Sequence, residues 1–258
     1  MKPNRFLLAL VFSSVLLFPS AAQQPPIAVP SAQRDAHGLT ILTQCLLAMG
    51  PLYSPTRTTL ARGIITYPDG TTKTVSIETI GNDSLRHDIG TNDFAFVSSA
   101  GDGFLILGGK KTKLPSWITA YKRAEHLPGL SLMSDYQNPN LQVQYVALES
   151  VNGNPAHHLR LSMLASDNTP PEIQDMMSEF QVWIDQASLL VVKTRHFDFS
   201  PQAIQNRTPV DIFYSDYRVQ DGATVPFHLT RFVANQKQCE IVFSTISLTA
   251  AVSVSDFQ

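Results

Sequence analysis

Histidine is the residue type in this chain best suited to metal or acid–base chemistry, and two histidines are adjacent, His157 and His158. Adjacent residues of a regular strand point to opposite faces of the sheet, so this pair is not expected to hold one metal ion. His196 and Asp198 share a strand face, but the spacing indicates no third ligand, and a cross-strand hydrogen bond is the expected role. We therefore predict no metal site and no cofactor.

Nucleophilic catalysis has no recognisable motif in the sequence. No G-x-S-x-G turn occurs, and none of the seven histidines stands in a nucleophile context. The carboxylates are scattered over predicted strand ends and turns, where hydration and turn capping explain them. We therefore expect a protein that is not an enzyme, and a secreted hydrolase with an unrecognised site is the remaining alternative.

The two cysteines, Cys45 and Cys239, are candidates for one disulfide. Neither belongs to a C-x-x-C pair, so neither a redox-exchange site nor a zinc ribbon is indicated. A bond between them would close a long loop, which chain entropy values at about 5 kcal/mol before strain. Two buried free thiols are the equal alternative, because unpaired cysteines are also common in protein cores.

Charge is nearly balanced over the chain, with 19 basic and 21 acidic residues among 258. The one basic group, Lys110, Lys111 and Lys113, is explained most simply by an exposed loop. We expect no nucleic-acid partner, because the clustered Lys and Arg of a nucleic-acid footprint are missing.

The first 22 residues have the pattern of a secretory signal peptide. Lys2 and Arg5 precede an apolar run from Phe6 to Phe18, and small residues lead to an expected cut after Ala22. This run of thirteen residues is shorter than the roughly 20 that a membrane-spanning helix needs. We therefore expect a periplasmic or secreted protein whose contact with membranes, if any, is peripheral.

An uncharged leader and one helix are expected next. Residues 23–34 are expected to be disordered, since most of this segment is rich in Pro, Gln and Ala and cannot build a packed element. From residue 35 to 49 apolar side chains recur at three- and four-residue steps, which predicts an amphipathic helix that Gly50-Pro51 ends. Residues 35–258 are then expected to form a single domain.

Segments with apolar residues at every second position dominate the rest and predict strands separated by turns. The predicted strands are 61–67, 73–79, 84–89, 94–98, 104–107, 141–148, 157–163, 179–185, 189–199, 210–219, 225–234 and 238–248. Residues 115–134 predict one or two short helices, 169–177 a loop or helical turn, and 200–208 a polar loop. We therefore predict a mainly β fold of the α+β class, with a strongly curved antiparallel sheet or incomplete β-barrel of about 11–12 strands under two or three short helices.

One face of this predicted sheet is apolar and must be covered. Apolar residues of the last strands share one phase, and we expect Cys239 to lie on the same covered face as the helix that carries Cys45. A curved sheet plugged by short helices can leave an apolar cavity for an apolar ligand, whereas a fully packed core fits the pattern equally well. The residues predicted to bind such a ligand are Trp117, Leu130, Met133, Phe180, Val182, Phe227 and Phe243.

The last third of the sequence resembles the periplasmic lipoprotein-carrier superfamily typified by LolA and LolB. The resemblance rests on FQVWID at 180–185, LLVVK at 189–193, YSDYR at 214–218, DG at 221–222 with VPF at 225–227, and VSDF at 254–257. VNGNPAHHLRL at 151–161 resembles further exported proteins of that fold. The resemblance implies an incomplete, strongly curved barrel whose mouth is closed by helices, with an apolar pocket for acyl chains.

We therefore expect an exported, non-enzymatic carrier or chaperone that binds an acyl chain, a lipoprotein or another apolar ligand. The alternative is an envelope scaffold or interaction protein with the same fold and a packed core. Trp183 bears on this choice, because alternation places it opposite Val182, where an exposed tryptophan would mark a partner or lipid-headgroup contact. Packing of Trp183 against a neighbouring side chain or loop is the competing explanation.

Overall fold

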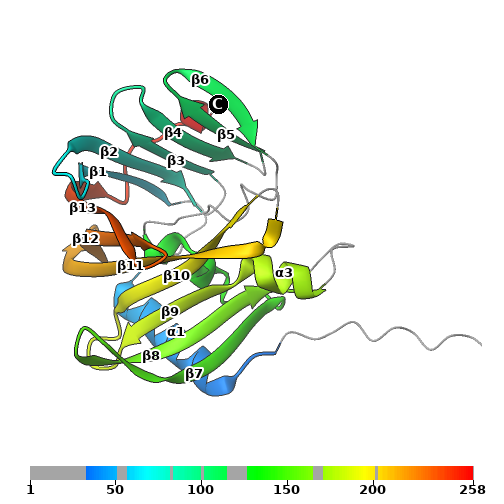
Figure 1. Cartoon of the computed structure of the whole chain (residues 1–258). Coiled ribbons are helices and arrows are strands. Elements are labelled where there is room, and N and C mark those ends of the chain that lie inside the picture. Colours follow the sequence, from blue (N-terminus) through cyan, green and yellow to red (C-terminus); the bar gives the residue numbers. More distant parts are fainter. Residues whose placement is uncertain are drawn as a thin grey trace, which may run out of the picture. The chain divides into compact units, whose positions relative to one another are not determined.

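The described residues form one antiparallel sheet of thirteen strands, which is open at two edges and not closed into a barrel (Figure 1). The computed structural model describes residues 33–50, 57–81, 84–99, 102–114, 127–164, 171–200 and 203–257, all of which belong to the unit Ser31–Gln258. The predicted signal peptide, the leader up to residue 32 and residues 115–126 of the predicted helical stretch lie outside the described residues. Within the described part of the chain, no helix has the length and apolar character needed to cross a bilayer.

The strands follow one another mostly as hairpins. They are β1 (Thr58–Thr66), β2 (Thr72–Ile80), β3 (Ser84–Ile89), β4 (Phe94–Ser99), β5 (Asp102–Leu107), β6 (Lys110–Leu114), β7 (Leu141–Val151), β8 (Asn154–Met163), β9 (Phe180–Asp185), β10 (Val191–Ser200), β11 (Ala203–Gln220), β12 (Ala223–Val233) and β13 (Gln236–Ser247). Their order across the sheet is β6-β5-β4-β3-β2-β1-β13-β12-β11-β10-β9-β8-β7. Two meanders are thus joined by the pairing of β1 with β13, and this join places β6 and β7 at the two edges.

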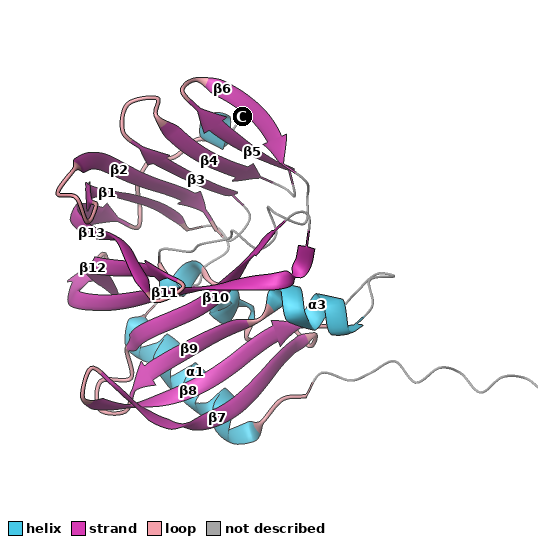
Figure 2. Ribbon diagram, in the orientation of Figure 1, coloured by secondary structure: helices cyan, strands magenta, loops and turns pink. Residues whose placement is uncertain are grey.

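Few helices accompany the strands in the described part of the chain (Figure 2). They are α1 (Ala36–Met49), α3 (Pro171–Ser178) and the short 3-10 turns η1 (Pro128–Leu130), η2 (Leu132–Asp135) and η3 (Val254–Phe257). The predicted mainly β architecture is confirmed, and the helical prediction for 115–134 is met by η1 and η2 in the part that the structure describes.

The α1 helix begins and ends where its sequence predicts. The Asp35 side chain caps its start by accepting a hydrogen bond from Gly38 N at 2.7 Å, and Gly50 ends it with a positive φ of 80°. Gly38 also permits close packing, because a Cβ there would lie 3.1 Å from the backbone nitrogen of Tyr145 in β7. Just before the helix, Arg34 bridges Val143 in parallel, so Gln33 and Arg34, which were assigned to the leader, lie beside β7.

Two strand segments were missed by the sequence interpretation. Lys110–Leu114 is the edge strand β6, although its lysines had indicated an exposed loop; the three lysines are exposed, as that interpretation expected. Lysine-rich edge strands are common because charge discourages pairing with another chain. The polar segment 200–208 contains the start of β11, which pairs with β10.

Candidate functional site

The sheet face beneath α1 carries one continuous cluster of buried apolar side chains, which we call the core face. The cluster contains α1 residues such as Leu42 and Met49 together with strand residues from β4 to β7 across the β1–β13 join. Figure 1 shows α1 lying across the strands β7 to β9. The core face is therefore the apolar interior of the described fold.

Four of the predicted ligand-binding side chains belong to this cluster: Met133, Val182, Phe227 and Phe243. Phe180 is half-buried and packs against it. Trp117 and the side chain of Leu130 lie outside what the structure describes. Burial on one face is required of ligand-lining and of core residues alike, so the assignment of these residues to a ligand stays a prediction.

The disulfide that the sequence allowed is not formed, and Cys45 and Cys239 are both free and buried. They lie in the same core cluster, as their predicted common face requires. Cys45 Sγ is 3.8 Å from Met49 Sδ, one helical turn away. Burial raises the pKa of both thiols, so both are held in the unreactive protonated form.

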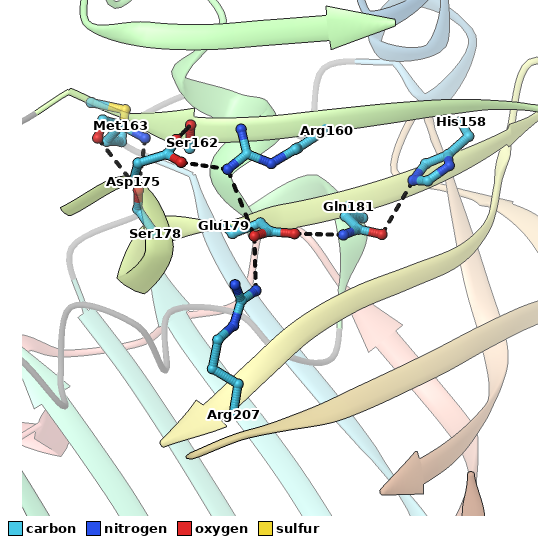
Figure 3. A network of polar contacts seen from close by, with 9 residues as sticks. All are labelled: His158, Arg160, Ser162, Met163, Asp175, Ser178, Glu179, Gln181 and Arg207. Carbon is cyan, nitrogen blue, oxygen red and sulfur yellow. Dashed lines mark hydrogen bonds and ion pairs between the residues drawn. The ribbon is translucent and has the colours of Figure 1, made fainter. Parts of the chain in front are cut away.

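A chain of hydrogen bonds and ion pairs crosses the opposite side of the sheet, which we call the outer face (Figure 3). Asp175 of α3 accepts hydrogen bonds from Arg160 Nη2 and Ser162 Oγ, both at 2.5 Å. Glu179 accepts hydrogen bonds from Arg207 Nη2 at 2.8 Å and from Gln181 Nε2 at 2.5 Å. The network thereby fixes α3 to β8 and links β8, β9 and β11.

The charges of this face are matched by one another. Burial would raise the pKa of Asp175, but the hydrogen bonds from Arg160 and Ser162 outweigh it and hold the pKa below its ordinary value. Further along the face, Arg195 donates two hydrogen bonds to Asp211, at 2.6 and 2.7 Å. The arrangement suits a structural network better than an open binding site.

Trp183 is buried within this outer face, so of the two explanations considered for it, packing against neighbouring side chains is the one that holds. The ring is 4 % exposed and stacks on His158 with centroids 4.1 Å apart. Lys193 Nζ lies 4.3 Å from the ring centroid, and Trp183 Nε1 donates a hydrogen bond to Glu149 at 2.8 Å. Alternation places the ring on the correct face, and side chains of the two neighbouring strands cover it, so Trp183 does not provide an exposed contact for a partner or a lipid headgroup.

His157 and His158 point to opposite faces of β8, as strand alternation predicts. His157 lies with Tyr145 and His37 under the N-terminus of α1, and burial together with His37 lowers its pKa. His158 hydrogen-bonds Glu149 and Gln181 on the outer face. Among the described residues, no group of three or more His, Cys, Asp or Glu side chains is arranged to hold a metal ion.

Arg231 is a charged residue on the core face that the sequence interpretation overlooked. It pairs with Ile212 of β11 and Cys239 of β13, both of which are core residues. Its Nη2 lies 3.7 Å from Asp198 Oδ2. The signal was present in β12, where Arg231 continues the phase of Val225, Phe227 and Leu229.

Comparisons with known proteins support the fold. No family model matches the sequence, and no curated protein matches it either. A solved domain assigned to outer-membrane lipoprotein sorting, from Vibrio parahaemolyticus, superposes with a TM-score of 0.54 at 14% identity, covering 86% of this chain and 96% of its own.

Two further structures agree. A LolA superfamily protein from Nitrosomonas europaea gives a TM-score of 0.52 at 12% identity, covering 84% of this chain and 97% of its own. A DUF1329 family protein from Desulfovibrio piger gives 0.56 at 12% identity, covering 88% and 98%. The chain is therefore structurally similar to the LolA superfamily and to outer-membrane lipoprotein-sorting domains, and the resemblance inferred from the sequence is confirmed at the level of the fold.

Proposed function

We propose that this protein is an exported, non-enzymatic carrier or chaperone that holds an acyl chain, a lipoprotein or another apolar ligand on its core face. The observation that carries the proposal is the continuous apolar cluster, which extends across the sheet from β4 to β7 and includes the buried side chains of α1. Similarity to a domain assigned to lipoprotein sorting supports this ligand class. Export rests on the signal-peptide pattern of the first 22 residues.

An acyl chain suits such a face because its affinity comes from apolar area alone. Each buried methylene contributes about 0.8 kcal/mol, so a chain of ordinary length binds without specific polar contacts. Met133 adds an unbranched, flexible side chain, which adapts to ligands of varied shape. The predicted ligand-binding residues are accordingly proposed as the lining of this site.

Native mass spectrometry of the mature protein, purified from an envelope fraction and then extracted with organic solvent, tests the proposal. We expect a co-purifying lipid or acylated peptide, and recovery of binding when a fluorescent acyl probe is added to the extracted protein. An empty protein that binds no acyl probe would contradict the carrier function and favour the scaffold with a packed core.

A matched pair of variants locates the binding face. Phe227 lies in the core cluster, whereas Phe213 of the neighbouring strand packs against Trp183 in the small outer-face cluster. We expect Phe227→Ala to change the affinity for the acyl probe and Phe213→Ala to leave it unchanged. Equal effects of the two substitutions would place the probe elsewhere.

A further inference from the structure

Arg231 is a charged residue on the core face, where the proposed function places an acyl chain. The strand register sets it beside Ile212 on one side and Cys239 on the other, with Leu229 two residues earlier in the same phase. Its charge reaches into this cluster: burial dominates and raises the pKa of the Cys239 thiol, while Arg231 acts to lower it. The guanidinium therefore borders the apolar surface.

The N–H donors of the Arg231 guanidinium make few contacts with the described residues. A guanidinium carries five N–H donors, and the contact with Asp198 at 3.7 Å is longer than a hydrogen bond. The outer-face arginines differ: Arg195 binds Asp211 through two hydrogen bonds, and Arg160 binds Asp175 at 2.5 Å. Among the described residues, no hydrogen-bond acceptor is placed on Arg231.

Arg231 is also reachable from solvent. Its side chain is 22% exposed and that of Asp198 is 40% exposed, whereas Ile212 and Leu229 beside them are each 1% exposed. Arg231 lies two residues before the end of β12, next to the hairpin that leads to β13. A ligand with its polar end at this position would keep that end near water and its apolar end on the core face.

We propose that Arg231 is the headgroup anchor of the acyl site and binds the carboxylate or phosphate oxyanion of an amphiphile whose chain lies along Ile212, Leu229 and Ile241. The planar guanidinium fork matches both oxyanions, which accept two parallel hydrogen bonds. Asp198 then holds Arg231 in position while the site is empty, and the oxyanion of the ligand replaces Asp198 as the partner of the guanidinium when it binds. This proposal rests on the proposed function and narrows its ligand class to anionic amphiphiles.

Paired probes that differ only in the charge of the head test the anchor. The full mature protein is titrated with a fluorescent C16 fatty acid and its methyl ester, and by competition with hexadecyl phosphate and hexadecanol, at pH 7.4 and fixed salt. We expect the two anions to bind about 10- to 100-fold more tightly than their uncharged partners, the range of one charged hydrogen-bonded contact. The tighter of the two anions shows whether the natural head is a carboxylate or a phosphate.

Variants then assign the preference to one residue. Arg231→Met should abolish the preference while leaving the affinity for the methyl ester unchanged, which also shows that the variant is folded. Arg231→Lys should retain part of it, because the charge stays and the fork is lost. Arg62→Met is the matched control, since Arg62 is exposed on the outer face of β1, and it should preserve the preference.

The outcomes separate the two proposals. Equal binding of acid and ester by the unaltered protein, or a preference that survives Arg231→Met, would overturn the anchor while the carrier function stands. Failure of every probe to bind the unaltered protein would overturn the carrier function and the anchor together.

Discussion

The thiols of Cys45 and Cys239 are buried in one apolar cluster and are not joined. Because burial raises the pKa of both, neither presents the thiolate that reacts with alkylating agents. We expect iodoacetamide to label neither cysteine in the native protein and both in urea, as intact-mass spectrometry would show. Without reductant, a mass lower by two hydrogen atoms would demonstrate a disulfide and contradict the structure.

Trp183 contributes to stability rather than to a partner surface. Trp183→Ala should lower the free energy of unfolding by about 3–5 kcal/mol, the usual cost of removing a large buried aromatic side chain. Trp183→Phe keeps a ring beside His158 and loses the hydrogen bond to Glu149, so we expect a smaller loss of about 1–3 kcal/mol. Urea denaturation measures both, and an unchanged midpoint for the alanine variant would contradict the buried position.

We expect Asp211 to make the stability of the protein sensitive to acid. Burial would raise its pKa, but the hydrogen bond from Arg195 and the charge of Lys193 outweigh burial, so the pKa in the folded state lies below its ordinary value of about 3.9. Such a carboxylate stabilises the fold above pH 4, and this contribution is lost as the pH falls through the folded-state pKa.

We therefore expect Asp211→Asn to cost about 2–3 kcal/mol at pH 7 and to flatten the decline of stability below pH 4. Asp102→Asn serves as the control, because its ion pair with Lys113 is largely exposed and such pairs contribute little. Parallel acid profiles for Asp211→Asn and the unaltered protein would refute this role. The pair could not be predicted from the sequence, because Arg195 and Asp211 meet only through the β10–β11 register.

At the scale of elements, local patterns were sufficient wherever an element has one wet and one dry face. The helix predicted over 35–49 is α1 within one residue, and 84–89 matches β3. The edge strand β6 was not predicted, because its three lysines replace the alternation of apolar and polar residues that marks a strand. Arg231 was missed for a related reason. Alternation along a strand predicts the face on which a side chain lies, but it does not show whether a charged side chain has a partner there.

Gly63 marks a bulge where β1 shifts register against β13. A Cβ at this position would lie 2.2 Å from the Val242 carbonyl oxygen and 2.8 Å from Phe243 Cα, both of which belong to the backbone. We expect Gly63→Ala to lower the free energy of unfolding by about 3 kcal/mol or more, because a paired strand backbone cannot move away from the new methyl group as a flexible side chain could. Thermal unfolding measures the loss. The control is Ile64→Ala at the next position, which is 45% exposed, and we expect it to lower the free energy of unfolding by about 1 kcal/mol or less.

At the scale of the whole molecule, the sequence predicts a protein that reaches its site of action by export. Expressed with its first 22 residues in a secreting bacterium, the protein should accumulate outside the cytoplasm with Gln23 as its first residue. N-terminal sequencing of the fractionated protein measures this. A protein that retains Met1 in the cytoplasm would contradict both the signal peptide and the carrier role that depends on it.

The β1–β13 join also governs the order in which the chain can fold. Among the described strands, eleven of the twelve pairings link neighbours in sequence and can form as soon as both strands have been made, whereas β1 pairs with the last strand. During synthesis or translocation the edge of β1 therefore stays unpaired until nearly the whole chain has been made or translocated. A bare strand edge is a template for aggregation, so this interval is when the nascent protein most needs protection.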